Sequence, residues 1–203
     1  FKMELLLNSN VFAEGIGKST FASHFPDPVF IDTEGGTKRL NVKRLPQPTS
    51  WAMLLDEVAE VRKALEDGCN EIDMVVNISD VKNGLLDKVE EEIRTLKKEC
   101  GHHILKVIIE TCYLTEEEKI AMCKAVTNAG ADFIKTSTGF GTGGATKEDV
   151  ELFKKYISPN VKIKAAGGVS SMEDLEMFLG LGCERIGTSR AVGLCKGELT
   201  EGY

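Results

Sequence analysis

Two lysines lie within apolar segments of the sequence, and this pattern indicates amine chemistry. Lys135 lies in DFIKTST and Lys164 in VKIKAAGG, and both stretches resemble buried strands. An ammonium is costly to bury without a partner, and a second cation nearby lowers the pKa of an amine further. One of the two amines would then be neutral and able to attack a carbonyl to form a Schiff base. Two ordinary lysines whose ends reach solvent are the alternative interpretation.

A carboxylate in the run EIDMVV is the expected partner of these lysines. Asp73 would compensate their charge or move a proton during the reaction. A solvated acid at the end of a strand is the alternative interpretation of the same residue.

Glycine-rich turns follow two later strand-like segments, AAGG and IGTS, and predict a site for a small anion. Glycine lets the backbone approach an anion closely, and the N–H groups that open the next helix point back at the turn. In barrels the loops after the last two strands are the usual phosphate site, so we expect a small phosphorylated substrate. The residues expected to contact it are Gly167, Gly168, Gly187, Thr188, Ser189 and Thr138.

A third glycine pattern is weaker. Gly139, Gly141 and Gly144 match GxGxxG between a strand and a helix, which is typical of dinucleotide sites. Such a site also needs an acid about 20 residues further on, at the end of the next strand. That strand, VKIKAAGG, has none. A flexible loop over the site is therefore the favoured interpretation.

The segment GIGKST resembles the second half of a phosphate-binding P-loop. The complete pattern needs glycine at position 12, where this chain has Phe12, whose side chain would hinder the tight turn. Residues that could still contact a nucleotide are Gly17, Lys18, Ser19 and Thr20. A working ATP site is the less favoured interpretation because the motif is broken.

The segments that position these residues alternate between strand-like and helix-like patterns. Strands are predicted at 71–78, 103–110, 132–138, 161–168 and 184–189. Helices are predicted at 50–68, 85–98, 115–126, 146–157 and 170–182. Nearly continuous apolar strands between helices indicate a parallel sheet in an α/β fold. Two further candidates, 3–7 and 28–32, bring the total to about seven strands, which does not distinguish an eight-stranded barrel from an open sheet.

Composition excludes several classes of protein. The chain has 203 residues, 42% hydrophobic and 28% charged, which is typical of a globular domain. The net charge of −7 disfavours broad nucleic-acid binding. No run approaches the roughly 18 apolar residues of a membrane span, so we expect no membrane partner and a cytoplasmic location. The six cysteines are widely spaced, which favours reduced thiols over a zinc site.

At EIDMVVN, KTSTGFGTGGAT and KIKAAGG the chain resembles the deoxyribose-phosphate aldolase family, over residues from about 59 to 203. The resemblance implies a (β/α)8 barrel and a class I aldolase that uses neither metal nor cofactor. The implied reaction is reversible cleavage of 2-deoxyribose 5-phosphate to acetaldehyde and glyceraldehyde 3-phosphate. Lys135 is implied to be the Schiff-base lysine, Lys164 the lysine that tunes it, and Asp73 the acid/base partner.

Residues 1–57 resemble instead the start of a phage-type P-loop nucleotide-binding ATPase. We therefore expect an α/β fold of TIM (β/α)8-like type, in one compact domain. Residues 58–203 would supply barrel strands 4 to 8, and P-loop-type segments would replace the first three units. A homodimer is the expected assembly. The alternative functions are a nucleotide-binding P-loop module and an inactive hybrid of two α/β fragments.

Overall fold

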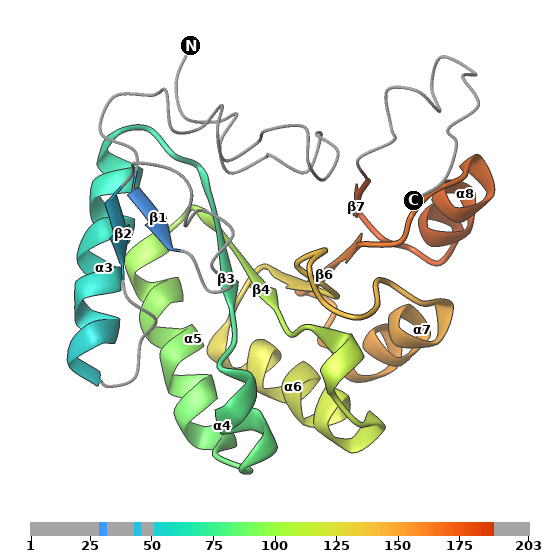
Figure 1. Cartoon of the computed structure of the whole chain (residues 1–203), viewed down its shortest axis with the longest axis horizontal. Coiled ribbons are helices and arrows are strands. Elements are labelled where there is room, and N and C mark those ends of the chain that lie inside the picture. Colours follow the sequence, from blue (N-terminus) through green and yellow to red (C-terminus); the bar gives the residue numbers. More distant parts are fainter. Residues whose placement is uncertain (1–28, 32–42, 46–50, 189–203) are drawn as a thin grey trace.

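A five-stranded parallel sheet forms the centre of the molecule (Figure 1). The computed structural model describes residues 29–31, 43–45 and 51–188. The strands of the sheet, in spatial and chain order, are β3 (Glu71–Val75), β4 (Ile104–Ile108), β5 (Phe133–Lys135), β6 (Lys162–Ala166) and β7 (Arg185–Gly187). These are the five strands predicted for the later part of the chain. In the part of the chain that the structure describes, the sheet is open, with β3 and β7 at its edges.

Helices connect the parallel strands, as crossover connections require. They are α3 (Trp51–Glu66), α4 (Ile78–Lys82), α5 (Leu86–Cys100), α6 (Glu116–Ala129), α7 (Lys147–Tyr156) and α8 (Met172–Gly180). The predicted starts are confirmed by side-chain caps. Thr115 and Ser171 form capping boxes with Glu118 and Asp174, and the Thr146 side chain accepts from the Asp149 N–H.

The first strand of the sheet is shorter than predicted. It was expected to run over 71–78, but β3 ends at Val75 and α4 begins at Ile78. Asn77 is the reason, because its side chain accepts the Asp80 N–H at 3.2 Å and so starts a helix. The turn Thr111–Tyr113, a 3-10 helix after β4, was likewise not predicted.

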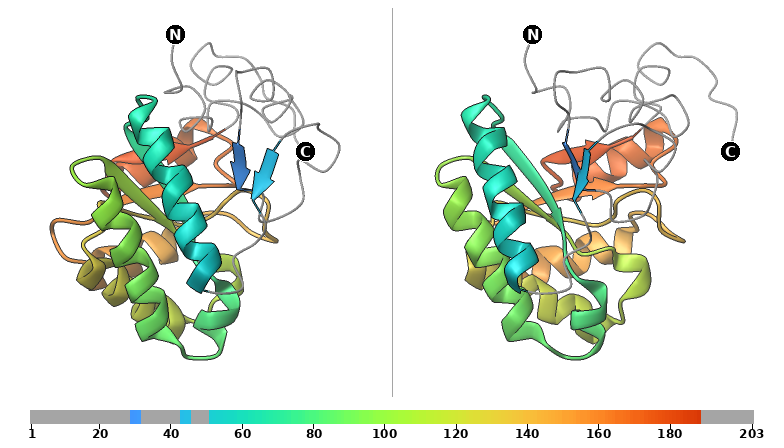
Figure 2. Two further views of the ribbon diagram at one scale, coloured as in Figure 1. Left: turned by 90° about the vertical axis from the view of Figure 1, so that its left-hand side faces the viewer. Right: turned by 60° about the vertical axis from the view of Figure 1, so that its left-hand side comes forward.

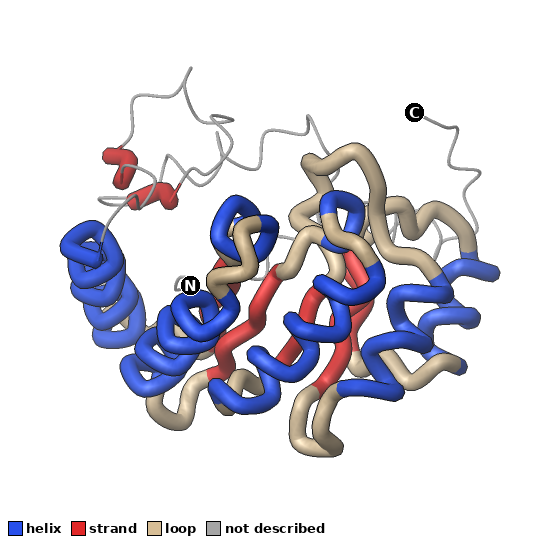
Figure 3. Tube along the Cα trace, turned by 90° about the horizontal axis from the view of Figure 1, so that it is seen from below, coloured by secondary structure: helices blue, strands red, loops and turns tan. Residues whose placement is uncertain are grey.

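Helices cover one face of the curved sheet. Figure 2 shows α3 alongside α5, and Figure 3 shows the helices arranged along one side of the strands. Apolar side chains fill the space between sheet and helices. The largest fully buried ones include Ile93 of α5, Met122 of α6 and Phe153 of α7, together with Leu105 and Ile134 of the sheet. This layer is the hydrophobic core, and it leaves the opposite face of the sheet for other side chains.

Upstream, β1 (Val29–Ile31) and β2 (Lys43–Leu45) form a two-stranded parallel pair. The strand predicted at 28–32 is thereby confirmed, whereas β2 was missed because its sequence, KRL, lacks an apolar run. The strand predicted at 3–7 lies outside the described residues. None of the described helices is long and apolar enough to cross a membrane.

Candidate active site

Charged side chains occupy the face of the sheet that the helices leave uncovered. The period of two along a strand explains this separation. On β4, Leu105 and Val107 are buried in the apolar core, so Lys106 between them points to the other face. Strand register places further charged residues beside each other on the sheet. Lys106 pairs with Asp73 on β3, and Lys135 on β5 pairs with Lys164 on β6. The predicted catalytic residues therefore lie on one face of the sheet.

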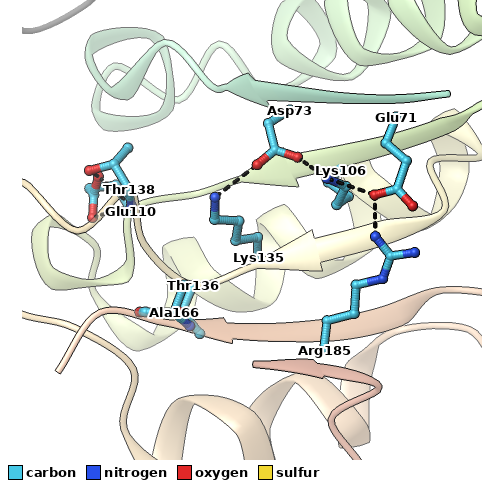
Figure 4. Close-up of polar contacts among 9 residues, drawn as sticks. All are labelled: Glu71, Asp73, Lys106, Glu110, Lys135, Thr136, Thr138, Ala166 and Arg185. Atoms are coloured by element: carbon cyan, nitrogen blue, oxygen red, sulfur yellow. Dashed lines mark hydrogen bonds and ion pairs between the residues drawn. The ribbon is translucent and has the colours of Figure 1, made fainter. Parts of the chain in front are cut away.

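Asp73 connects two of the lysines on this face (Figure 4). The Lys135 ammonium donates to Asp73 Oδ2 at 2.9 Å, across the intervening strand β4. Lys106 contacts Asp73 Oδ1 and lies 3.1 Å from Glu71 Oε2, in ion pairs that are not well-directed hydrogen bonds. Glu71 in turn pairs with Arg185 of β7. A chain of ion pairs therefore runs from one edge of the sheet to the other.

The three lysines on this face are deeply buried. Lys106, Lys135 and Lys164 are 0%, 3% and 4% exposed. Burial opposes ionisation of Asp73, but the charges of Lys135 and Lys106 outweigh it and lower the pKa of this carboxyl. Basic side chains outnumber acidic ones on the face, so one ammonium remains less well compensated than the others.

That residue is Lys164. Burial of its ammonium, reinforced by the neighbouring charge of Lys135, lowers the pKa of Lys164 to about 8. Asp73 acts in the opposite direction but does not offset these effects. The sequence predicted a lowered amine pKa within this pair, and the resemblance assigned the Schiff base to Lys135. In the structure the pKa of Lys164 is lowered, and the Lys135 ammonium donates to Asp73.

A threonine beyond the end of β5 holds the lysine strands in register. The Thr136 hydroxyl donates to the Ala166 carbonyl at 3.0 Å and accepts the Ala166 N–H at 3.0 Å. The Thr136 N–H donates to the Lys164 carbonyl, and its own carbonyl accepts from Thr111. Thr136 is fully buried, so these bonds extend the pairing of β5 and β6 just past the two lysines.

The glycine turns predicted to bind phosphate lie side by side. Gly167 and Gly168 follow β6 with φ of 80° and 73°, a left-handed conformation that glycine adopts without penalty. Gly187 ends the neighbouring strand β7, and the Thr188 hydroxyl donates to the Val169 carbonyl at 2.7 Å, joining the two turns. Ser189 lies outside the described residues, as do the nucleotide candidates Gly17, Lys18, Ser19 and Thr20.

Thr138 has a partner that the sequence analysis did not foresee. Its N–H lies 3.1 Å from Glu110 Oε2, and its hydroxyl also contacts this carboxylate. Glu110 is 3% exposed and lies two residues beyond the end of β4. The sequence does show an acid at the end of an apolar strand, which is a candidate functional residue. Its spacing alone does not reveal which neighbouring loop the acid contacts.

Two thiols lie in the apolar core, Cys100 and Cys123. Burial raises the pKa of Cys100 to about 11 and of Cys123 to about 12, which keeps both protonated and unreactive. Within residues 29–31, 43–45 and 51–188, no group of three or more His, Cys, Asp or Glu could hold a metal ion.

Parallel strands in chain order, with helices on one face and buried lysines on the other, define an α/β enzyme of the barrel-like aldolase class. The chain belongs to the DeoC/LacD aldolase family, whose model matches residues 34–197. The match thus begins upstream of residue 58, where the aldolase portion was expected to start.

Similar proteins agree with this membership. The chain is 72% identical over 156 residues to a deoxyribose-phosphate aldolase of Clostridium botulinum, covering 77% of this chain and 71% of that protein. It is 56% identical over 154 residues to one of Streptococcus pyogenes, covering 76% and 69%. Among solved structures, "QR15, an Aldolase" has a TM-score of 0.68 at 37% identity, covering 77% of this chain and 72% of that chain. A tetrameric deoxyribose phosphate aldolase from Aeropyrum pernix has a TM-score of 0.65 at 29% identity, covering 80% and 70%.

Thr136→Val tests the link between the lysine strands. The substitution keeps the shape of the side chain but leaves the buried Ala166 N–H and carbonyl without this partner, so we expect a loss of about 1–3 kcal/mol in the free energy of unfolding. Thr136→Ser keeps the hydroxyl and is the matched control, with a loss of about 1 kcal/mol for the missing methyl. Urea unfolding measures both. Equal losses in the two variants would contradict the role given to the hydroxyl.

Lys164→Met tests the lowered pKa through stability. Because the pKa of Lys164 is about 8 in the folded chain and its ordinary value is 10.5, burial destabilises the wild type below pH 8, and this penalty disappears as the pH rises to 10.5. We expect Lys164→Met to be more stable than wild type at pH 7 by about 3 kcal/mol at most, and the gain to shrink by pH 10. Urea titrations at both pH values measure it, with exposed Lys124→Met as control. A gain that is the same at pH 7 and pH 10 would disprove the assignment.

Proposed function

We propose that this chain is a class I aldolase that cleaves 2-deoxy-D-ribose 5-phosphate to acetaldehyde and D-glyceraldehyde 3-phosphate through an imine on Lys135. The observation that supports this most directly is the buried triplet in which Lys135 donates to Asp73 and pairs in register with Lys164. The deoxyribose-phosphate aldolases at 72% and 56% identity support the choice of substrate.

The reaction begins when Lys135 loses a proton, because only a neutral amine attacks a carbonyl. Lys164 is suited to accept that proton, since its pKa of about 8 leaves a fraction of its amine neutral near pH 7. After this transfer the pair still carries one positive charge, now on Lys164, and the Lys135 amine is neutral. In this proposal Lys164 acts as the proton acceptor, and Lys135 is the nucleophile.

The Lys135 amine then adds to the aldehyde carbon of the sugar phosphate, and loss of water forms a protonated imine. The imine accepts the electron pair of the C2–C3 bond as that bond breaks, while the C3 hydroxyl gives its proton to a base. Asp73, held by Lys135 and Lys106, is the base or the group that positions a water to act as one. D-Glyceraldehyde 3-phosphate leaves, C2 of the resulting enamine takes a proton, and hydrolysis of the imine releases acetaldehyde and restores the amine.

The phosphate end of the substrate would lie at the glycine turns after β6 and β7. Two consecutive left-handed glycines expose backbone N–H groups there, and α8 begins just beyond, so its N-terminal dipole favours an anion. The excess of basic side chains on the same face of the sheet adds to this attraction. Gly167, Gly168, Gly187 and Thr188 are the proposed contacts among the described residues.

Borohydride reduction in the presence of acetaldehyde tests the nucleophile. Reduction fixes the imine as a stable secondary amine, and peptide mass mapping should locate the adduct on Lys135. Lys135→Ala should lose the adduct and turnover completely, while Asp73→Asn should keep a slow adduct and lose about 10²–10⁴-fold in kcat. Exposed Lys124→Ala is the control for nonspecific labelling. An adduct on Lys164, or none on folded wild type, would reject the proposal.

A further inference from the structure

Glu110 is held in an unfavourable backbone conformation at the end of β4. Its φ and ψ are 50° and 67°, and it is the one residue other than glycine with a positive φ in the part of the chain that the structure describes. This left-handed conformation costs a side chain of this kind on the order of 1 kcal/mol or more. The surrounding contacts must therefore hold it, and those contacts involve the carboxylate.

The Glu110 carboxylate is bound by Thr138, the residue immediately before the glycine-rich loop. The Thr138 N–H donates to Oε2 at 3.1 Å, and the Thr138 hydroxyl contacts the same oxygen. The Thr138 hydroxyl oxygen also accepts the Phe140 N–H at 3.1 Å. Because the Thr138 donors face a carboxylate, and a carboxylate repels a phosphate, Thr138 serves here to anchor the loop.

The loop that follows, residues 139–144, is packed too closely for side chains at two glycines. A Cβ on Gly141 would lie 2.7 Å from Cys112 Sγ and 3.1 Å from Glu110 Oε1. A Cβ on Gly144 would lie 2.3 Å from the Gly167 carbonyl carbon. The loop therefore touches Glu110 at one end and the proposed phosphate turn at the other.

Backbone hydrogen bonds complete the connection. The Ala145 N–H donates to the carbonyls of Ala166 and Gly167, at 3.1 and 3.0 Å. The ends of β4, β5 and β6 are thus joined in sequence by Glu110, Thr138 and the loop. The Lys135–Asp73 contact depends on none of these bonds, since it is formed on the sheet itself.

We propose that Glu110 is a positioning residue that sets the affinity for the phosphate end of the substrate. It acts through Thr138, which fixes residues 139–144 against the Gly167 turn, and it does not touch the reacting carbon atoms. This inference rests on the proposed aldolase function and adds a determinant of substrate specificity to it. It also replaces the expected role of Thr138 as a phosphate contact.

The test measures phosphate binding separately from the chemical steps of the reaction. Initial rates are measured with 2-deoxyribose 5-phosphate and with unphosphorylated 2-deoxyribose for wild type, Glu110→Gln, Thr138→Val and Thr138→Ser. We expect Glu110→Gln and Thr138→Val each to raise KM for the phosphorylated sugar about tenfold, with kcat within about twofold, because each weakens a hydrogen bond to a charged group. KM for 2-deoxyribose should not change. Thr138→Ser, which keeps the hydroxyl, should behave like wild type.

Two further measurements make the outcome decisive. The double variant Glu110→Gln with Thr138→Val should raise KM no more than either single variant, because each substitution removes the same contact between Glu110 and Thr138. Glu148→Gln removes an exposed carboxylate from the start of α7 and should leave KM unchanged. If Glu110→Gln fails to fold, Thr138→Val and Thr138→Ser still test the link.

The inference is overturned if KM rises equally for both sugars, if kcat falls while KM stays constant, or if Thr138→Ser resembles Thr138→Val. Acetaldehyde trapping on Lys135 distinguishes this failure from a failure of the proposed function, because acetaldehyde has no phosphate. Trapping in wild type with unchanged KM in the variants rejects only the role of Glu110. Absence of trapping in folded wild type rejects the aldolase proposal itself.

Discussion

The contact between Asp73 and Lys135 compensates the most costly feature of this fold. That feature is the burial of ammonium groups on the face of the sheet opposite the helices. A buried charge that loses its partner is strongly destabilising, because desolvation is no longer offset by attraction. Asp73 contacts two of the three buried lysines, and Glu71 adds a second carboxylate to Lys106. Burial of the Lys164 ammonium, together with the charge of Lys135, lowers the pKa of Lys164, and the more distant charge of Asp73 does not offset this.

The fold separates stability from chemistry by using the two faces of its strands. Side chains that alternate along β4 belong in turn to the apolar core and to the charged face. The core needs only apolar residues of suitable size, whereas the charged face needs specific partners at specific register positions. Beyond the strands, Thr136 and Glu110 connect neighbouring strand ends, so the lysines and the loops above them are held by different sets of hydrogen bonds.

Family membership rests on a match that spans most of the described chain, and the match includes residues upstream of the expected boundary at 58. All three proposed catalytic residues lie on β3, β5 and β6, within the residues 34–197 that match the family. The division into an N-terminal segment at 1–57 and an aldolase portion at 58–203 stays a prediction, as does the homodimer. The P-loop resemblance concerns residues 1–57, and its candidate nucleotide-binding residues at 17–20 lie outside the residues that the structure describes.

The amino-acid sequence by itself determined the alternation of strands and helices, the helix caps and the candidate lysines, because these depend on local spacing. Apolar runs, Thr115 and Ser171 are all signals within a few residues of the feature they predict. Only the tertiary structure decided that the lowered pKa falls on Lys164 and that Glu110 engages Thr138. Both results depend on distances between residues far apart in the chain, and strand register and burial set those distances.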